Sequence, residues 1–397
     1  MTKAVITHTD FRIYWSPRLS ALTEYLHGKD IELEIIEIAG AGSPYAFSGD
    51  SASHPANWHC LFPNKRMEEI SPSAANIALR RKLNDLKPDI VFAGAIAFPS
   101  GAAGVRWAVE HKRKIVIFDD ARLVDVPRSA LVDFVKKRIY SCADAILCPS
   151  KVWNPTFTYF GFKEFQIFYG LNVVDNSFWK NQNPTESNNS TSAYILTIGR
   201  QIPKKNFLFL VNAFQVYASI TAKPKELVLV GDGPEHESLV EFSNQNGLKT
   251  VTFLPFRSQD DLKNIYQKAD YFILPSRHGE TWGLVVNEAM ASGLPVIVSS
   301  QVGCASTLVK DGVNGYTFSP NNVNELADLL IKMDTLGAEE RREMGEKSKE
   351  IISDWGLDRF CQGAYDAIQF VSGSASKKPR VFTRLILKFW KGRYRPV

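Results

Sequence analysis

The stretch that decides the fold is residues 269–297, ADYFILPSRHGETWGLVVNEAMASGLPVI. Residues 271–274 form an apolar run before a proline, which is typical of a buried parallel strand. The polar segment 276–282 predicts a loop, and residues 283–292 predict a helix that ends at Gly293. Because ligands of open α/β sheets bind where strands end and helices begin, we expect a binding site at this junction.

Two glutamates flank the junction, with seven residues between them. Glu280 falls in the loop, whereas Glu288 falls about one and a half turns into the helix, at 3.6 residues per turn. The first backbone N–H groups of a helix have no partner inside it, so those of Gly283, Leu284 and Val285 can hold an anion. A phosphate cradle between two carboxylates suits a nucleotide sugar. The alternative is an ordinary strand, loop and helix with two solvated glutamates.

A glutamate, seven residues and a second glutamate, in the run GETWGLVVNEAMASGLPVI, resemble the signature of glycosyltransferase family 4. Members are retaining transferases with the GT-B fold. The resemblance therefore implies an α/β protein of two Rossmann-like, doubly wound domains that face a central cleft. It also implies a C-terminal helix that crosses back to the first domain. It is strong over residues 190–320 and looser over residues 1–180.

Composition and charge narrow the class of protein. The 397 residues suggest two or three domains. Five cysteines without paired or metal-like spacing, no signal-peptide pattern and no run of about 20 apolar residues favour a cytoplasmic protein. The net charge is +5, but residues 367–397 hold eight Lys or Arg and no Asp or Glu, which leaves −3 for residues 1–366. A nucleic-acid binder would more often carry its basic residues on the folded domain, so no nucleic-acid partner is expected.

Strand and helix patterns alternate along the first half of the chain, which predicts a parallel, doubly wound sheet. The expected strands are residues 4–7, 33–38, 89–93, 114–118, 145–148 and 166–168. The expected helices lie near residues 16–27, 73–86, 101–111 and 128–141. Residues 40–72, rich in Gly, Ser, Pro and Asn, interrupt the alternation and predict a long ordered loop.

The polar segment 180–192, KNQNPTESNNSTS, predicts a linker between two domains. Strand patterns then resume at residues 194–198, 227–230, 251–254, 271–274 and 296–298. We therefore expect an N-terminal domain at 1–180 and a C-terminal domain at 193–355, to which the resemblance assigns acceptor binding and nucleotide-sugar binding. The crossing helix would be residues 356–371, and a basic amphipathic tail would occupy residues 372–397.

A basic loop follows the strand at 194–198, in the run YILTIGRQIPKKN. Gly199 allows a tight turn and a close approach of ligand to backbone. The resemblance maps diphosphate ligands onto Arg200 and Lys205; the alternative is a solvated basic loop. No two aspartates are spaced i, i+2 to hold a metal. We therefore expect no metal and no cofactor, with the two cations and the helix dipole at Gly283 stabilising the leaving diphosphate.

The resemblance assigns the other donor contacts. Glu288 would accept hydrogen bonds from ribose hydroxyls, and Glu280 would face the donor sugar, either as a nucleophile or beside a same-face reaction in which the leaving phosphate accepts the proton. We favour the same-face route. The run FLPFR would meet the nucleobase. The predicted donor site is Gly199, Arg200, Lys205, Phe256, Arg257, Glu280, Thr281, Trp282, Gly283, Leu284, Val285 and Glu288.

Three departures from the family pattern concern the sugar and the acceptor. No glycine-rich loop follows the first strand, where the chain reads THTDFRIYWSPR, and Thr307 stands near a position where relatives carry a glutamate. In IVIFDDAR, Asp119 stands where many relatives have a histidine. Asp119 could accept the acceptor hydroxyl's hydrogen bond, or it could be structural. The predicted catalytic residues are thus Glu280, Arg200, Lys205 and Asp119.

The resemblance, together with the lack of an Asp-any-Asp pair, thus predicts a retaining, metal-independent transferase that moves a sugar from a nucleotide diphosphate sugar to an acceptor hydroxyl. UDP is the commonest donor nucleotide in the family and GDP the next, so a UDP sugar is the first expectation. The acceptor would be a lipid-linked saccharide in polysaccharide or glycolipid synthesis, at the cytoplasmic face of a membrane. The alternatives are an epimerase or a phosphorylase of the same fold, and a non-catalytic nucleotide-sugar-binding protein.

The tail predicts contact with an anionic membrane surface. If residues 380–395 are helical, an apolar half opposes a basic half, which is the pattern of an interfacial helix. The apolar half is Val381, Phe382, Leu385, Ile386, Phe389 and Trp390, and the basic half is Arg380, Arg384, Lys388, Lys391 and Arg395. Leu387 and Arg393 do not fit either half. The alternative is a docked or disordered tail.

Overall fold

A computed structural model describes residues 1–11, 13–41, 55–125, 128–180, 193–375, 377 and 379–393. The chain forms two compact units. The first unit comprises Met1–Val173 and Leu357–Val397, and the second comprises Val174–Gly356. Residues 181–192, in the expected linker, and Arg395 lie outside the described residues.

The first unit is built on a seven-stranded, parallel sheet in the order β3-β2-β1-β4-β5-β6-β7. Its strands are β1 (Thr2–His8), β2 (Ile31–Ala39), β3 (Trp58–Phe62), β4 (Ile90–Ala93), β5 (Lys114–Phe118), β6 (Ala145–Cys148) and β7 (Ile167–Tyr169). The order reverses between β1 and β4, which is where doubly wound sheets open a crevice for ligands. All six expected strands of this half are therefore confirmed within a few residues.

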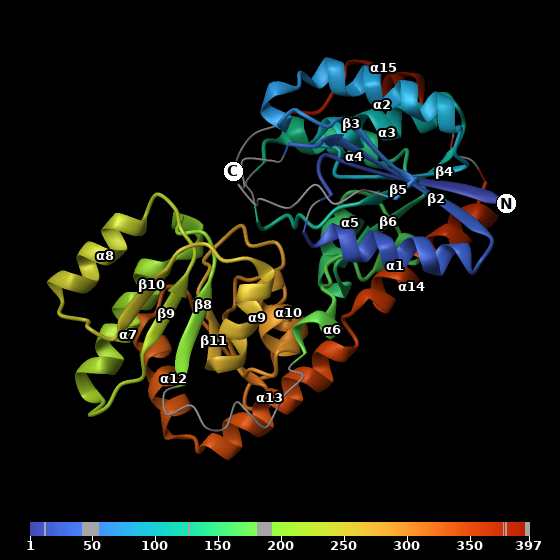
Figure 1. The fold of residues 1–397 in the computed structure, drawn as a ribbon. Helices are drawn as coiled ribbons and strands as arrows, with labels where there is room; N and C mark the ends of the chain where they lie inside the picture. The colour runs from blue at the N-terminus through green and yellow to red at the C-terminus, as the bar shows by residue number, and fades with distance from the viewer. Residues whose placement is uncertain are drawn as a thin grey trace. The chain divides into compact units, whose positions relative to one another are not determined.

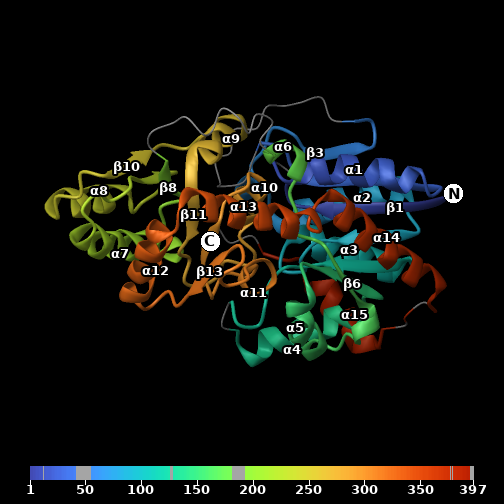
Figure 2. The same ribbon diagram turned by 90° about the horizontal axis from the view of Figure 1, so that it is seen from below.

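Helices cover both faces of this sheet: α2 and α3 lie on one face, and α1 and α14 lie side by side on the other (Figures 1 and 2). The helices are α1 (Trp15–His27), α2 (Pro72–Leu86), α3 (Pro99–Glu110), α4 (Ala130–Tyr140), α5 (Asn154–Tyr159), α14 (Leu357–Gly373) and α15 (Val381–Phe389). Short 3₁₀ turns are η1 (Met67–Glu69), η2 (Lys151–Trp153) and η3 (Glu164–Gln166). Phe360, Ala364 and Ile368 of α14 are buried in the core of this unit, which confirms the expected crossing helix.

The expectation of a loop over residues 40–72 is wrong for part of that range. β3 pairs in parallel with β2, with Trp58 opposite Ile35 and Phe62 opposite Ala39, and η1 follows it. β3 is a five-residue edge strand in which only Trp58 is buried, so its sequence, WHCLF, lacks the apolar run of an inner strand. Residues 42–54 lie outside the described part.

The second unit carries a six-stranded, parallel sheet in the order β10-β9-β8-β11-β12-β13. Its strands are β8 (Tyr194–Ile198), β9 (Leu227–Val230), β10 (Val251–Leu254), β11 (Ala269–Leu274), β12 (Val296–Ser299) and β13 (Gly315–Phe318). The five expected strands are confirmed, and β13 is an additional edge strand.

In the second unit, α7, α8 and α12 lie on one face of the sheet and α9 and α10 on the other (Figure 1). The helices are α6 (Asn176–Trp179), α7 (Phe207–Ile220), α8 (His236–Gln245), α9 (Gln259–Lys268), α10 (Leu284–Ala291), α11 (Ala305–Leu308), α12 (Val323–Thr335) and α13 (Ala338–Ser353), with the 3₁₀ turn η5 (Pro203–Lys205). In the part of the chain that the structure describes, no helix is long and apolar enough to cross a membrane.

Candidate active site

The junction between β11 and α10 ends at a glycine that the backbone requires. Gly283 precedes α10 with φ +95°, in the left-handed region that favours glycine. A Cβ there would lie 2.9 Å from side-chain atoms of both Leu274 and Val302, so a larger residue would also clash. Val286 N donates to Gly283 O at 2.9 Å. The N–H groups of residues 283–285 therefore precede the first bond of the helix, at its positive end.

Glu280 and Lys205 form an ion pair of 2.6 Å between Oε2 and Nζ. The two side chains are only 14% and 11% exposed, and Ser276 Oγ donates to the same carboxylate oxygen at 3.2 Å. Burial raises the pKa of Glu280, but the cations Lys205 and Lys204 and the hydrogen bonds outweigh burial and hold it below its ordinary value. Glu280 is therefore a carboxylate held by a lysine that the chain supplies from a distant segment.

The basic loop after β8 is fastened to the loop after β11. Arg277 N donates to Lys204 O at 3.0 Å, and Lys204 Nζ donates to Gly279 O at 3.4 Å. Asn206, with φ +58°, donates to Pro275 O at 3.3 Å, just before α7. Asparagine adopts this left-handed conformation more readily than most residues. These contacts fix Lys205 against Glu280.

Gln201 is a buried residue that sequence analysis did not single out. Its Nε2 donates to Gly231 O at 2.8 Å, and its Oε1 lies 2.8 Å from His236 Nδ1. A Cβ on Gly231 would lie 2.1 Å from Gly199 O, so the backbones after β8 and β9 approach closely. The basic loop and the Gly-Asp-Gly turn after β9 are therefore held together by direct contacts. The only sequence signal was a polar residue beside the predicted ligand Arg200.

Glu288 is 1% exposed on α10, and its Oε2 accepts a hydrogen bond of 2.8 Å from Tyr266 Oη. Tyr266 belongs to α9, is fully buried, and also donates to Val285 O at 3.2 Å. Its ring packs edge-on against Trp179 at 5.5 Å. Tyr266 thus fixes the orientation of Glu288. Sequence reasoning missed it because a tyrosine at a helix end carries no spacing signal.

The segment 280–282 is also held by the residues that follow β12. Gly303 N donates to Glu280 O, and Cys304 N donates to Trp282 O, each at 3.0 Å. A Cβ on Gly303 would lie 1.8 Å from Thr281 O. The buried Trp282 donates from Nε1 to Asn287 Oδ1 at 2.8 Å. This loop is therefore tightly packed, which suits a site that must hold its groups in place.

Most predicted donor-site residues follow the strands β8, β10 and β11, whose carboxyl ends lie at one edge of the parallel sheet. Direct contact is observed between Lys205 and Glu280. Arg200 is partly exposed after β8. Phe256, 48% exposed, and Arg257 follow β10, two strands away from β8 along the same edge. Among the described residues, no group of three or more His, Cys, Asp or Glu side chains is arranged to hold a metal ion.

Asp119 follows β5 in the first unit and is 4% exposed. Its Oδ2 accepts from Lys136 Nζ at 3.2 Å and from Tyr140 Oη, and its Oδ1 accepts from Ala121 N at 2.9 Å. Burial raises the pKa of Asp119, but Lys136, Tyr140 and the backbone N–H together hold it below the ordinary value. These partners lie within residues 119–140, so the carboxylate ties the end of β5 to α4.

His8, at the end of β1, is a second polar residue at this edge that sequence analysis did not single out. Its ring packs against Phe11, Trp15 and Phe118 with centroids 5.2–5.6 Å apart. Burial lowers the pKa of His8 to about 4, so the imidazole is neutral near pH 7. β1 and β5 flank β4 in one parallel sheet, so His8 and Asp119 follow strands that end at the same edge.

Comparison with known proteins gives matches that centre on the second unit. Residues 179–351 match the family model described as glycosyl transferases group 1. Over 169 residues the chain is 30% identical to an uncharacterized glycosyltransferase of Methanocaldococcus jannaschii, covering 42% of this chain and 45% of the relative. The chain spans less than half the length of this relative and of three further curated relatives.

Solved structures match nearly the whole chain. Sucrose-phosphate synthase from Thermosynechococcus elongatus has a TM-score of 0.74 at 17% identity, over 94% of this chain and 100% of that chain. Anabaena HepE in complex with UDP has a TM-score of 0.71 at 17% identity, over 93% of this chain and 100% of that chain. This likeness confirms the expected GT-B fold. In the sequence of residues 179–351 and in the fold of the chain, this protein is therefore similar to group 1 glycosyl transferases.

Proposed function

We propose that the protein is a retaining glycosyltransferase that moves a sugar from a nucleotide diphosphate sugar to an acceptor hydroxyl without a metal ion. The observation that carries this proposal is the 2.6 Å ion pair of Lys205 and Glu280 beside the start of α10. A cation suited to phosphate and a carboxylate suited to sugar hydroxyls thus meet near a helix N-terminus, which itself attracts anions.

In this proposal the leaving diphosphate is stabilised by Arg200, Lys205 and the N–H groups of Gly283, Leu284 and Val285. Breaking the sugar–phosphate bond adds negative charge to the diphosphate. Each charge-assisted hydrogen bond contributes roughly 1.5–3 kcal/mol, and a helix N-terminus about 0.3–2 kcal/mol. Together these groups supply several kcal/mol where charge develops, without a metal ion.

The rest of the donor is assigned to neighbouring groups. Glu288 would accept hydrogen bonds from the ribose hydroxyls, with Tyr266 keeping its carboxylate oriented. Phe256 and Arg257 would contact the base. Gly199, Thr281 and Trp282 would complete the wall of the donor site, since a glycine at a strand end permits close approach of a ligand.

Two routes give retention of configuration. In one, a Glu280 oxygen displaces the diphosphate from the anomeric carbon to form a sugar–enzyme ester, and the acceptor oxygen then displaces Glu280 in a second inversion, with its proton passing to the departed phosphate. In the other, the acceptor attacks from the face that the phosphate leaves, and a phosphate oxygen takes the acceptor's proton. The contact with Lys205 supports the second route, because a carboxylate neutralised at 2.6 Å is a weaker nucleophile.

The acceptor is proposed to bind the first unit. Asp119 is one candidate to accept the hydrogen bond of the acceptor hydroxyl, but Lys136 and Tyr140 already use its Oδ2. The neutral His8 at the same edge is the second candidate. UDP is the preferred nucleotide in this proposal, and the UDP complex of HepE, a neighbour in fold, supports this choice.

The acceptor class proposed is a lipid-linked saccharide of a polysaccharide or glycolipid. The basic tail supports this part, because eight Lys or Arg without an acidic residue favour an anionic membrane surface. The protein would then act as a peripheral protein on the cytoplasmic face of that membrane.

The test is a binding screen of UDP, GDP and ADP sugars, followed by mass measurement of products formed with lipid-linked saccharides. Nuclear magnetic resonance of the product should show the anomeric configuration of the donor, whereas the opposite configuration would exclude a retaining mechanism. Transfer should persist in excess EDTA, and complete loss restored by magnesium or manganese would refute metal independence.

The same assay separates the alternatives. An epimerase would convert the nucleotide sugar with no acceptor present, and a phosphorylase would require inorganic phosphate to release a sugar phosphate. A non-catalytic binding protein would bind the nucleotide sugar and leave it unchanged. The proposed transferase should consume the donor only when an acceptor is added, apart from slow hydrolysis.

A further inference from the structure

Helix α15 docks on the first unit through a narrow face. Thr383 and Leu387 are buried at 2% and 3% exposure, and Trp390 Nε1 donates to Ile96 O at 2.7 Å. Leu387 is the apolar residue that did not fit the apolar half of the predicted helix. Leu387 packs against the first unit and holds α15 there, so most of the apolar half of the helix faces away from the protein.

The apolar half of α15 is largely exposed. Val381, Phe382, Leu385 and Phe389 are between 48% and 76% exposed, although the helix has only nine residues. Exposed apolar side chains scattered singly are ordinary, but a contiguous group of this size marks an interaction surface. The way in which α15 docks therefore presents these side chains outward.

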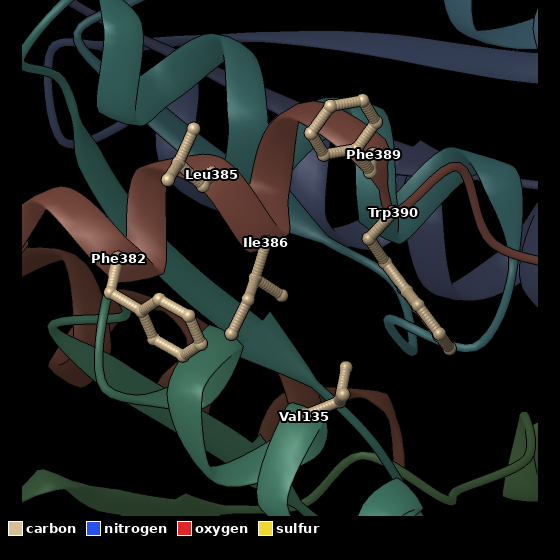
Figure 3. Close-up of a pocket in the computed structure, with 6 residues that line it drawn as sticks. All are labelled: Val135, Phe382, Leu385, Ile386, Phe389 and Trp390. Atoms are coloured by element: carbon tan, nitrogen blue, oxygen red, sulfur yellow. The ribbon is translucent and has the colours of Figure 1, made fainter.

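Helix α4 extends this apolar surface. Its Leu131 and Phe134 are exposed, and the rings of Phe134 and Phe382 lie 6.2 Å apart. Figure 3 shows Phe382, Ile386 and Trp390 pointing into the space between the two helices, toward Val135. This groove has a volume of about 360 Å³ and is lined by six apolar or aromatic residues: Val135, Phe382, Leu385, Ile386, Phe389 and Trp390. We call these six residues, with Leu131 and Phe134, the α4–α15 platform.

Cations border the platform. Arg384 and Lys388 are exposed on α15, and the exposed Arg380 and Lys391 flank its two ends. On α4 the Arg138 guanidinium lies 5.0 Å from the centre of the Phe134 ring. Asp133, the acidic residue of α4, is 3.3 Å from Arg128 and is thus already neutralised. An apolar surface edged by cations, with no acidic residue after Asp366, is complementary to an anionic lipid surface.

We propose that the α4–α15 platform is the membrane-contacting surface of the protein and seats on an anionic bilayer. Phe134, Phe382, Leu385 and Phe389 enter the boundary between headgroups and acyl chains, and the bordering cations face the anionic headgroups. The inference rests on the proposed function for its purpose, which is to hold the first unit at the surface that carries a lipid-linked acceptor. It differs from a tail acting as a flexible tether, because three of the eight platform residues, Leu131, Phe134 and Val135, belong to α4.

The test measures co-sedimentation of the full chain with phosphatidylcholine vesicles, with and without phosphatidylglycerol. Phe382→Ser/Phe389→Ser and, separately, Leu131→Ser/Phe134→Ser should each weaken binding to anionic vesicles by roughly tenfold or more, as expected for lost apolar burial. The matched control is Ile220→Ser at the end of α7, which replaces an apolar side chain that is 66% exposed on the second unit. The control should bind as the unmodified chain does.

The electrostatic part has its own control. Arg384→Ala/Lys388→Ala should weaken binding to anionic vesicles and reduce its salt dependence, whereas Lys29→Ala/Arg81→Ala, which removes two exposed cations elsewhere in the first unit, should not. All these substitutions are at exposed positions. Thermal unfolding and UDP binding should therefore match the unmodified chain and verify that each variant is folded.

Three outcomes would overturn the proposal. If the α4 variant binds normally while removal of residues 380–397 abolishes binding, the tail alone is a tether. If every variant binds like the unmodified chain, the platform is not the contact. If the full chain self-associates through the platform and ignores vesicles, its partner is a second copy. None of these readouts depends on sugar transfer, so failure here leaves the proposed function standing, and absence of transfer leaves the vesicle result valid.

Discussion

Each unit contains a buried carboxylate paired with a lysine just after a parallel strand. In the first unit Asp119 lies 3.2 Å from Lys136, and in the second Glu280 lies 2.6 Å from Lys205. Both carboxylates have a pKa below the ordinary value although burial opposes ionisation. In charge and burial the two pairs are close equivalents.

Their other partners differ. Asp119 also accepts from Tyr140 and from the Ala121 N–H, so its network closes within one short segment of chain. The pair of Glu280 and Lys205 joins two loops that follow different strands, at an edge where further cations lie. The difference teaches that a buried ion pair does not identify a catalytic group by itself, and that the remaining partners and the location must be considered.

The largest expected effect comes from removing the cation of the second pair. Lys205→Ala should lower kcat by roughly 10²–10³-fold, because a preorganised charge that stabilises the transition state is lost. Lys204→Ala, the adjacent control, should have a much smaller effect, since Lys204 Nζ contacts a backbone carbonyl. Steady-state kinetics at varied donor concentration checks this. A change in KM alone would make Lys205 a ground-state anchor.

Removing the negative charge of the first pair, that of Asp119, should lower the stability of the protein. Asp119→Asn keeps the shape but leaves Lys136 without its carboxylate, which should cost about 3 kcal/mol of unfolding free energy. Glu110→Gln, in a more exposed pair with Arg80 and Arg106, should cost about 1 kcal/mol or less. Urea unfolding measures both. A fully stable Asp119→Asn variant that loses turnover would instead give Asp119 a catalytic role.

Glu288 is a third buried carboxylate, and its hydrogen-bond partner is a tyrosine instead of a lysine. Glu288→Ala should weaken binding of the nucleotide diphosphate by roughly 1–3 kcal/mol, because ribose hydroxyls lose their acceptor. Tyr266→Phe removes only the orienting hydroxyl and should weaken binding by about 1 kcal/mol. Titration calorimetry with the nucleotide measures both. Unchanged affinity in a folded Glu288→Ala variant would exclude the ribose role.

The two units should also differ in how their stability responds to mild acid. The pKa of His8 falls to about 4 in the folded protein, against about 6.5 unfolded. The unfolded chain therefore takes up the proton first, and stability present above pH 6.5 is lost as pH falls toward 4, by about 2 kcal/mol at pH 5 and about 3 kcal/mol in full. Glu280 and Asp119 have depressed pKa values in the folded protein, so the stability that their charges contribute is lost only as pH falls below their unfolded values of about 4.3 and 3.9.

Thermal unfolding at pH 7 and pH 5 tests the role of His8. The unmodified protein should lose stability between these values, and His8→Phe, which keeps an aromatic ring against Phe11 and Trp15, should lose less. An equal loss in both proteins would mean that other groups control the acid response.

Apolar runs made the inner strands of both sheets predictable, because strands buried on both faces must be apolar along their whole length. The edge strand β3 was missed for the same reason, since most of WHCLF is only half-buried. Glu280, Glu288 and Lys205 could be proposed as site residues from motif and spacing. Tyr266 and Gln201 could not, because their roles arise from contacts between segments far apart in sequence.

The tail shows where periodicity is insufficient. The helical pattern over residues 380–390 was readable, but a helical wheel does not say which face meets the protein. The face that meets the protein carries Leu387, which is buried although it did not fit the apolar half of the predicted helix.

The return of α14 to the first unit has a consequence for synthesis of the chain. Residues 174–356 are continuous, so the second unit can complete its core soon after that segment leaves the ribosome. The first unit completes its core later, because the apolar surfaces of α1, β5, β6 and β7 are covered by α14, which is translated after the second unit. The unit translated first is thus the one that finishes last. Until then it exposes an uncovered sheet face to chaperones and to other nascent chains.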